Sequence, residues 1–289
     1  MNLKVAAVIV TFNRLKLLKT VVESIRKQTH IPDCIIVVNN GSTDGSKEWL
    51  ENQSDCIVVN QDNLGATGGF YTGIKKALEL NTDKIWILDD DIAPEPNCLE
   101  ELFKLSSTGC AITAPQRYHG IIPFRPEPLR CNFTNPFKSM WIRHPVDSDY
   151  IDGVVKVECG TFEGPLIDAK VFHQVGLPDQ DFFIFADDTE FFERCWRKGF
   201  PTFITEKAKI QRLIPFDAGK KVVWKRYYEL RNLVVLDIRF GNPLVKILRP
   251  FGYGLKSTLR SNSLKEIQLV WQGIFDGYRG KLGKKSITF

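Results

Sequence analysis

The sequence lacks several features that would identify a class of protein at once. It has no CxxC pair, and its seven cysteines are scattered over 289 residues, which favours reduced thiols over a disulfide framework. No stretch approaches the roughly 18 consecutive apolar residues that a membrane span requires. The first residues show no small-residue cleavage site of a secretory leader. These absences predict a cytoplasmic protein.

Composition alone names no function, because 43% hydrophobic and 25% charged residues are ordinary for a globular protein. The net charge of +5 is unevenly distributed, however. Residues 241–289 contain nine Lys or Arg against two acids, a net charge of +7, so the remainder is weakly acidic. The basic character belongs to the C-terminal segment, and no nucleic-acid-binding module accompanies it.

Short apolar runs alternate with helical patterns through the first ninety residues or so. Four runs are typical of buried strands and the three segments between them are typical of helices: 5–12, 34–40, 56–60 and 84–88 for the strands, and 15–28, 42–52 and 69–80 for the helices. This order predicts an α/β fold, with a Rossmann-like, mostly parallel central sheet flanked by helices.

The pattern changes after the predicted sheet. Residues 117–157 are rich in proline and aromatic residues without a sustained period, which indicates loops and short strands. Residues 182–186, FFIFA, are an apolar run typical of a strand, and an amphipathic helix follows them. Residues 222–240 are strongly helical. We therefore expect an α/β domain over residues 1–240 and a helical extension over 241–289.

Three consecutive aspartates, Asp89 to Asp91, follow the last of these predicted strands. Ligands bind open α/β sheets beyond the carboxyl ends of the strands, where an Asp-x-Asp pair can hold Mg²⁺ through oxygen ligands. Side chains alternate in extended backbone, so Asp90 is free to point elsewhere. The alternative is a solvated acidic loop whose aspartate caps the next helix. Because adjacent carboxylates repel one another, we expect a cation among them.

Other polar segments follow predicted strands on the same edge of the sheet. The glycines of NLGATGGF (63–70) can turn backbone N–H groups towards a phosphate, although such a segment is also typical of a tight turn. The segments VTFNR (10–14) and VVNNGSTDGS (37–46) supply amide and hydroxyl groups that can bind a base and a ribose.

In this order, and at these strand ends, the segments resemble the family 2 glycosyltransferases, which have the GT-A fold. The resemblance covers about residues 3–240. It rests on five matches: Thr11, Asn13 and Arg14; NGSTD (40–44); NLGATGG (63–69); the Asp-x-Asp of Asp89 to Asp91; and DDTEF (187–191), which matches the base motif of inverting members. The triple aspartate, GGFYTG (68–73) and YYELRN (227–232) look most like the galactofuranosyl- and rhamnosyltransferase branch.

The resemblance implies a role for each matched residue. Asp188 would be the catalytic base in an inverting transfer, and Asp89 and Asp91 would bind a divalent cation, Mn²⁺ or Mg²⁺. Weaker contacts with the acceptor or the diphosphate would come from Asp187, Glu190, Arg212 and Arg231. The donor nucleotide would contact Thr11, Asn13, Arg14, Asn40, Asn63, Gly65, Gly69 and Asp89.

The resemblance also implies the substrates. The donor would be a UDP- or dTDP-sugar that carries galactofuranose or rhamnose. The acceptor would be a hydroxyl of a glycan or lipid-linked glycan in cell-surface polysaccharide synthesis.

One departure concerns the metal. Family members commonly add a histidine ligand about two dozen residues after the base, but the last histidine here is His173. The matching position falls near Gln211 and Arg212, where an arginine would supply positive charge without ligating metal. Strict metal dependence is therefore left open, and the histidines at 30, 119, 144 and 173 are expected to be structural or to lie on the surface.

Two other classes of function are left open as well. A nucleotidyltransferase also binds a nucleotide and a metal on such a sheet, but the glycine-rich signature expected after the first strand is missing from VTFNRLKLLK (10–19). A catalytically inactive sugar-nucleotide-binding protein is disfavoured by the complete set of Asp89, Asp91 and Asp188. The missing histidine favours it.

The C-terminal extension has two interpretations. Leu264, Ile267, Trp271, Ile274 and Phe275 can form one apolar helix face flanked by lysines and arginines. Such a basic amphipathic helix suits peripheral attachment to an anionic membrane, here the inner face of the cell membrane. Alternatively, the helix packs on the α/β domain and leaves its charges in water.

Overall fold

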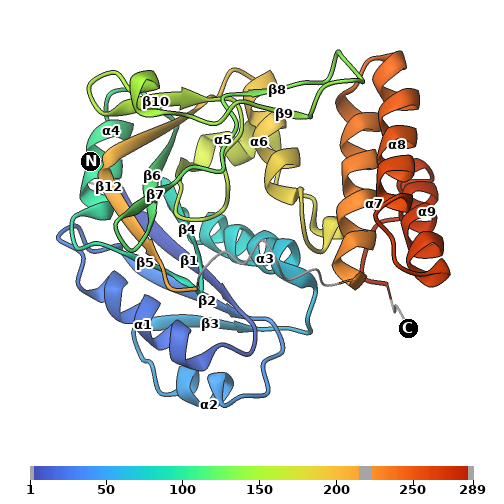
Figure 1. Ribbon diagram of the computed structural model, residues 1–289. Coiled ribbons are helices and arrows are strands. Elements are labelled where there is room, and N and C mark those ends of the chain that lie inside the picture. The colour runs from blue at the N-terminus through green and yellow to red at the C-terminus, as the bar shows by residue number, and fades with distance from the viewer. Residues whose placement is uncertain (1–2, 215–222, 286–289) are drawn as a thin grey trace.

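A mixed, mostly parallel β-sheet runs through the molecule, and helices cover both of its faces (Figure 1). The computed structural model describes residues 3–214 and 223–285. The strands of this sheet are β1 (Val5–Thr11), β2 (Cys34–Asn39), β3 (Cys56–Asn60), β4 (Lys84–Asp89), β5 (Ile92–Pro94), β6 (Ile112–His119), β7 (Ile122–Phe124), β10 (Val154–Val157), β11 (Leu166–Asp168) and β12 (Thr202–Arg212). Their order is β10-β12-β6-β11-β4-β1-β2-β3, with β5 paired to β12 and β7 paired to β6.

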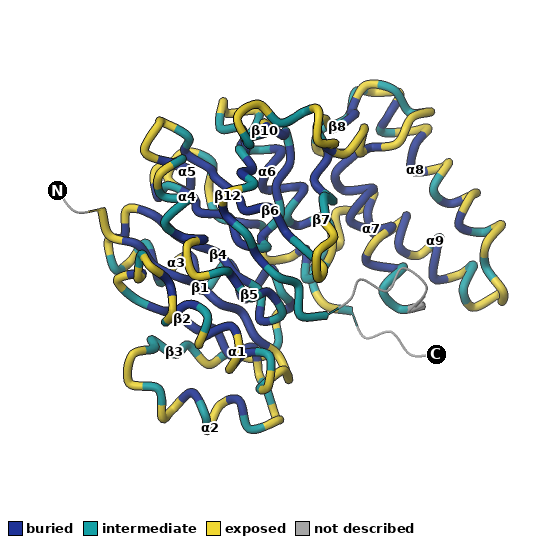
Figure 2. Tube along the Cα trace, turned by 60° about the vertical axis from the view of Figure 1, so that its left-hand side comes forward, coloured by how far each residue is buried: buried dark blue, intermediate teal, exposed yellow. Residues whose placement is uncertain are grey.

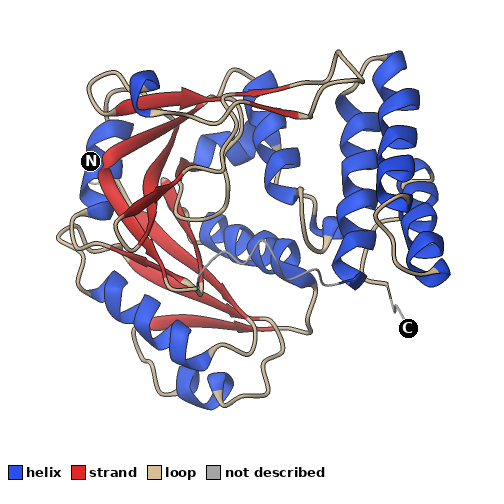
Figure 3. Cartoon of the chain, in the orientation of Figure 1, coloured by secondary structure: helices blue, strands red, loops and turns tan. Residues whose placement is uncertain are grey.

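The helices and a separate two-stranded sheet complete the described fold (Figure 3). The small sheet consists of β8 (Arg130–Cys131) and β9 (Trp141–Ile142). The helices are α1 (Leu15–Arg26), α2 (Ser46–Glu51), α3 (Gly65–Glu79), α4 (Cys98–Ser106), α5 (Ala169–Val175), α6 (Asp187–Arg197), α7 (Val223–Phe240), α8 (Pro243–Thr258) and α9 (Leu264–Tyr278), with the short 3-10 helices η1 (Asp147–Asp149) and η2 (Gln180–Phe182).

The parallel half of the sheet confirms the predicted α/β architecture. Strands β3, β2, β1 and β4 are parallel neighbours. Their register sets Thr11 of β1 opposite Asn39 of β2, and Val10 opposite Asp89 of β4. The polar strand ends therefore meet at one edge. The short strand β11 continues the sheet antiparallel to both β4 and β6, and its three residues are too few for a periodic signal in the sequence.

The first strand shows why these strands are continuous apolar runs. Val5, Ala7 and Ile9 lie in a hydrophobic cluster with residues of α1 and α4. The residues that alternate with them lie in a second cluster, on the opposite face, with residues of α3, α5 and α6. Figure 2 shows the buried trace running along the strands between these layers. A strand that is covered on both faces has no exposed side to carry polar residues.

Helix α3 begins at Gly65, four residues before the predicted start at 69. Glycines normally weaken a helix, and their number favoured a loop. Here they allow the helix to lie close against the sheet, because a Cβ atom added at Gly69 would come within 2.3 Å of Val10 Cγ1. Tertiary packing therefore overrides the local preference.

The predicted strand at residues 182–186 is wrong. Phe182 ends the 3-10 helix η2, and Phe183, Phe185 and Ala186 have left-handed φ angles of 67°, 67° and 58°. Side chains of α7, rather than a neighbouring strand, bind the carbonyl groups of Phe182, Ile184 and Phe185. These residues form a turn, which we call the 183–186 turn.

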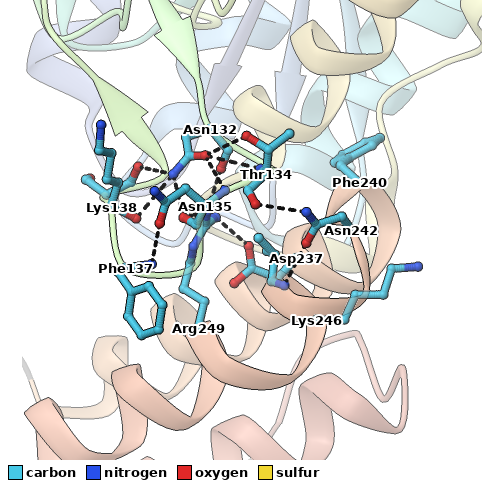
Figure 4. A network of polar contacts seen from close by, with 12 residues as sticks. Asn132, Thr134, Asn135, Phe137, Lys138, Asp237, Phe240, Asn242, Lys246 and Arg249 are labelled. Atoms are coloured by element: carbon cyan, nitrogen blue, oxygen red, sulfur yellow. Dashed lines mark hydrogen bonds and ion pairs between the residues drawn. The ribbon is translucent and has the colours of Figure 1, made fainter.

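The three C-terminal helices lie side by side, on the far side of α3 and α6 from the main sheet (Figure 1). Buried Arg249 of α8 donates a hydrogen bond to Asp237 of α7 at 2.8 Å. The same guanidinium also binds the carbonyl oxygens of Asn132 and Asn135 at 2.7 and 3.0 Å, as part of the network in Figure 4. These contacts join the extension to the loop between β8 and β9, so α8 is packed into the fold.

Helix α9 packs on α7 as well. The Tyr227 hydroxyl of α7 donates to buried Asp276 of α9 at 2.7 Å. The apolar face predicted for this helix is divided, because Ile274 is buried whereas Leu264 and Phe275 are exposed. Within residues 3–214 and 223–285, no helix is long and apolar enough to cross a membrane.

Candidate functional site

The aspartates at the end of β4 occupy different positions. Asp90 is buried, and its carboxylate accepts hydrogen bonds from Thr11 Oγ1 and from Arg14 Nη1, each at 2.8 Å. Asp91 accepts from the same nitrogen of Arg14 at 2.9 Å. Although burial opposes it, the charges of Asp90 and Asp91 raise the pKa of Arg14. Arg14 therefore supplies the cation expected among the aspartates, and buried Thr11 holds Asp90 in place.

Of the three aspartates, Asp89 is the one whose negative charge is least compensated. Burial raises its pKa well above the usual range, and the charges of Asp91, Glu163 and Asp90 raise it further. Arg14 lowers it by less than these effects raise it. A carboxyl group in this position would be stabilised in its ionised form by an additional cation.

The loops after β1 and β2 are tied to each other by Asn13. Its amide N–H donates to Ser42 Oγ at 3.0 Å, and its side-chain oxygen accepts from the amide of Thr43 at 2.7 Å. Asn13 has a left-handed φ of 53°, which asparagine tolerates better than most residues. Its side chain is exposed at the sheet edge.

Asn40 and Asn63 fix the start of α3. Buried Asn40 donates to the carbonyl of Gly65 at 2.8 Å and accepts from the amide of Leu64 at 3.2 Å. Asn63 accepts from the amide of Gly65 at 2.9 Å. Gly65 has a φ of +81°, and a Cβ atom there would lie 2.0 Å from the carbonyl oxygen of Phe183. These predicted nucleotide contacts thus shape the loops that meet at the sheet edge.

Helix α7 holds the 183–186 turn through hydrogen bonds to its carbonyl groups. Arg231 is fully buried and donates to the carbonyls of Phe182 at 2.9 Å and Gly283 at 2.6 Å. The side chain of Asn232 donates to the carbonyls of Ile184 and Phe185 at 2.7 and 2.8 Å. The structure therefore places Arg231 behind the turn, with its guanidinium engaged by main-chain oxygens.

A cavity of about 510 Å³ brings Asp89 and Asp188 together, although 99 positions separate them in the sequence. Its wall is largely aromatic and apolar, with Phe70, Trp141, Phe162 and Phe185. The remaining lining residues are Ala66, Pro126, Glu127, Pro128, His144, Cys159, Gly160, Thr161, Glu163, Ala186, Asp187 and Thr189. A largely apolar cavity that is lined by a few carboxylates is typical of a site that binds a polar ligand.

The two acids that begin α6 are held differently. Asp187 is buried and accepts a hydrogen bond from Thr67 Oγ1 of α3 at 2.7 Å. Asp188 accepts from the amide of Thr189 at 2.6 Å. Removal from bulk water, followed by the charge of Asp187, raises the pKa of Asp188 to about 7. Asp188 is therefore a carboxyl group on the cavity wall that can gain or lose a proton near neutral pH.

Sequence reasoning missed Glu163, Arg117 and the pairing of Glu163 with Arg212. Glu163 lines the cavity between Arg117, which donates to it at 2.5 Å, and Arg212, which donates to both of its oxygens at 2.7 Å. Burial opposes ionisation, but the two guanidinium groups lower the pKa of Glu163 below its usual value. These three residues come from distant segments, so no local spacing in the sequence signals the triad. Arg212, predicted near the diphosphate, lies behind Glu163.

Two further predictions concern residues near the cavity. Glu190 is buried in ion pairs with Arg194 at 2.9 Å and Arg239 at 2.8 Å, and it is not among the lining residues. His144 is exposed, which agrees with the prediction that it is structural or on the surface, but it also lines the cavity, with Nδ1 3.2 Å from the carbonyl oxygen of Glu127. No signal in the sequence distinguished His144 from the other histidines.

The chain matches known proteins over most of its length. The family model described as glycosyl transferase family 2 matches residues 6–164, more than half of the chain. Among curated relatives, the galactofuranosyltransferase GlfT1 of Mycolicibacterium smegmatis is 29% identical over 209 residues, which cover 68% of this chain and 67% of that protein. The dTDP-rhamnosyl transferase RfbF of Shigella flexneri is 25% identical over an alignment that covers 98% of each chain.

The fold has solved counterparts. The crystal structure of GalNAc-T7 with UDP, GalNAc and Mn²⁺ superimposes with a TM-score of 0.68 at 14% identity. The match covers 96% of this chain and 56% of that chain, so this chain spans little more than half of that protein's length. At this identity the likeness shows the fold, which is GT-A, as predicted.

Replacing Gly65 with alanine tests whether close packing at the start of α3 holds the sheet edge. We expect Gly65→Ala to lower the free energy of unfolding by about 3 kcal/mol or more, because a left-handed φ and a clash with a backbone carbonyl act together. Gly109→Ala is the matched control, since Gly109 has a φ of +101° but no atom within 4 Å of the added Cβ. It should cost only about 1 kcal/mol of backbone strain. Equal losses in urea titrations of the two variants would contradict the packing role of Gly65.

Proposed function

Because the chain belongs to glycosyl transferase family 2, we propose that it transfers a sugar from a nucleoside-diphosphate donor to an acceptor hydroxyl, with inversion at the anomeric carbon. The names of its relatives support galactofuranose or rhamnose as the transferred sugar and UDP or dTDP as the carrier. The acceptor is a glycan or lipid-linked glycan. The observation that carries the proposal is the cavity that joins Asp89 to Asp188.

The donor nucleotide binds along the edge formed by the loops after β1 and β2 and by the start of α3. Asn13 and Arg14 are exposed there, and Asn63 is half-buried. Phe12 is 43% exposed on the same loop and offers a ring face on which a base can stack. Buried Thr11 and Asn40, with Gly65 and Gly69, act on the donor indirectly because they hold these loops in shape.

Asp89 and Asp91 would hold a divalent cation, Mn²⁺ or Mg²⁺. Their carboxylate oxygens are the ligands these ions prefer, and a dication would offset both the burial and the crowding of negative charge that raise the pKa of Asp89. Such an ion, when bound, neutralises charge that develops on the leaving diphosphate. Arg14, held by Asp90 and Asp91, is close enough to this pair to add a second positive charge.

Asp188 accepts the proton of the acceptor hydroxyl. A pKa of about 7 makes it a stronger base than an ordinary aspartate while leaving much of it ionised at neutral pH. Asp187 is the weaker candidate because Thr67 already donates a hydrogen bond to it. The aromatic wall, with Pro126 and Pro128, keeps water from the reacting centre.

Nucleotide binding tests the assignment of the metal ligands. UDP and dTDP should bind the wild type more tightly with Mn²⁺ than with chelator, and changing Asp89 and Asp91 together to Asn should remove this difference. Isothermal titration measures binding, and release of nucleoside diphosphate from UDP-galactofuranose and dTDP-rhamnose measures turnover. Equal binding and turnover of the wild type in Mn²⁺ and in chelator would transfer the role of counter-charge to Arg14. Binding without turnover of any sugar nucleotide, with acceptor present, would favour an inactive binding protein.

The base assignment predicts a pH profile. An ionised carboxylate is required, so kcat/KM should fall about tenfold per pH unit below about 7 and level off above it. Asp188→Asn should lower turnover by about 10²-fold or more with nucleotide binding intact. Asp187→Asn removes a charge that raises the pKa of Asp188, so it should move the acidic limb to lower pH. Near-normal turnover of Asp188→Asn would refute the base role.

We also propose that the enzyme attaches to an anionic membrane surface. The exposed apolar side chains that would make this contact lie on α8 rather than mainly on α9. Five side chains on α8 and at its C-cap lie at helical spacing and are more than half exposed: Leu244, Ile247, Phe251, Leu255 and Leu259, which we call the α8 stripe. Lys256 and Arg260 are exposed beside it, within a segment of net charge +7. Apolar side chains flanked by cations suit the headgroup region of anionic lipid.

Vesicle flotation tests this surface. The wild type should bind vesicles that contain phosphatidylserine at low salt, bind weakly at roughly 0.5 M salt, and bind pure phosphatidylcholine poorly, because salt screens the attraction. Changing Phe251 and Leu255 together to Glu should abolish binding. Ile121→Glu is the control, since Ile121 is 94% exposed on a distant turn. If the wild type ignores anionic vesicles but self-associates in sedimentation through Phe251, the α8 stripe is an interface between copies.

A further inference from the structure

A cluster of two thiols and a carboxylate lies at the wall of the cavity, and the proposed mechanism does not use it. Cys131 ends β8, Cys159 follows β10, and Glu193 lies on α6. The two sulfur atoms are 2.9 Å apart, and a Glu193 carboxylate oxygen lies within 4.8 Å of both. The three residues come from segments far apart in the sequence, so only the fold brings them together.

Glu193 is incompletely satisfied. Its side chain is buried, and its Oε1 accepts a hydrogen bond from Arg197 Nε at 2.6 Å. Its Oε2 is buried without a hydrogen-bond partner among the described residues. A buried carboxylate oxygen without a partner opposes folding, and native proteins rarely leave one unless a ligand, an ion or a water molecule completes it. This orphaned oxygen indicates that a further partner belongs here, and the two neighbouring sulfurs favour a metal ion as that partner.

We propose that Cys131, Cys159 and Glu193 bind a zinc ion, at a site distinct from the Asp89 and Asp91 pair. Zinc combines thiolate sulfur with carboxylate oxygen, and three protein ligands leave the fourth tetrahedral position for water. Binding replaces the two thiol protons, which pass to solvent. Cys131 is only half-buried, so the site opens towards the surface.

The present geometry is close to what the ion requires. A tetrahedral site with zinc–sulfur bonds of about 2.3 Å separates two sulfurs by roughly 3.8 Å, so the thiols must move apart by about 1 Å. Rotation of the half-buried Cys131 side chain supplies this movement. The Glu158 carboxylate accepts a hydrogen bond from the amide of Cys131 at 2.5 Å and so fixes that ligand's backbone. Arg197 offsets the negative charge that two thiolates and one carboxylate retain around a dication.

A disulfide between Cys131 and Cys159 explains less. It would use both sulfurs but leave Oε2 of Glu193 without a partner. It would also require an oxidant, whereas an ion accounts for the sulfurs and the oxygen at once.

The site would reinforce the cavity. Cys159 and the next two residues line the cavity, and α6 begins with Asp187 and Asp188. An ion shared by Cys159 and Glu193 would fix the segment at Cys159 to α6, the helix that carries the proposed base. This inference concerns a structural ion and does not depend on the transfer reaction.

Cobalt binding to the full-length protein, purified with reductant and stripped by chelator, tests the proposal. Co²⁺ should bind with a stoichiometry of about one ion at a thiolate site, give a sulfur-to-cobalt charge-transfer band, and be displaced by Zn²⁺. Cys131→Ser and Cys159→Ser should each lose the band, and Glu193→Gln should weaken binding by at least about tenfold. Cys195→Ala, on the same helix and buried, should keep the band. The double change of Asp89 and Asp91 to Asn should keep it as well, which separates the two sites.

A second measurement covers the case in which a cysteine variant fails to fold. X-ray absorption of the zinc-loaded wild type should show two sulfur ligands at about 2.3 Å. A shell of oxygen and nitrogen alone, or wild-type protein without the charge-transfer band, would overturn the proposal. So would a Cys131–Cys159 disulfide, seen as a loss of two hydrogen masses in protein prepared without reductant.

Discussion

The constraint on which this structure depends is the accumulation of carboxylates around one apolar cavity. Like charges placed close together and away from water destabilise a fold unless cations compensate them. Arg14 compensates two of the three aspartates after β4, and a pair of arginines encloses Glu163. Asp89, Glu127, Asp187 and Asp188 on the cavity wall all have raised pKa values, but Glu127 is paired with Arg117 and Asp187 accepts a hydrogen bond from Thr67, whereas Asp89 and Asp188 form no ion pair among the described residues. The fold stabilises the surrounding acids and leaves these two to a ligand, as functional sites commonly do.

The polar residues at the sheet edge fall into two groups, those that are buried and hold the loops in place and those that are exposed. Thr11 and Asn40 are buried. Thr11 donates a hydrogen bond to Asp90, and Asn40 donates one to the start of α3. Asn13 and Arg14 are exposed on the loop after β1. A family motif contains residues of both groups, because substitution of a residue that shapes a loop disables the site as surely as substitution of a residue in direct contact with the ligand. Burial separates the two groups, and burial is a property of the fold.

The parallel half of the sheet and the position of its polar edge were predictable, because buried strands and helices have strong periods and their order restricts the topology. The pairing of Asp89 with Asp188 rested on the family resemblance alone, and the cavity now provides its geometric support. Glu163, Arg117 and their link to Arg212 escaped prediction, since each member lies on a different segment. The strand predicted at residues 182–186 was wrong because an apolar run does not reveal that α7 will bind its carbonyls. Local patterns cannot report partners that the fold alone brings together.

Helix α7 also links the C-terminal helices to the backbone near the site. The 183–186 turn contains three residues with left-handed φ, a costly conformation for residues other than glycine. Arg231 and Asn232 hold that turn by its carbonyls, and α9 in turn packs on α7 through Asp276. Phe185 and Ala186 of the turn line the cavity, and Asp187 and Asp188 follow directly. The C-terminal helices therefore support the backbone that presents the proposed base. A boundary drawn after residue 240 marks a change in composition, and the contacts of Tyr227 with Asp276 and of Arg231 with Gly283 reach across it.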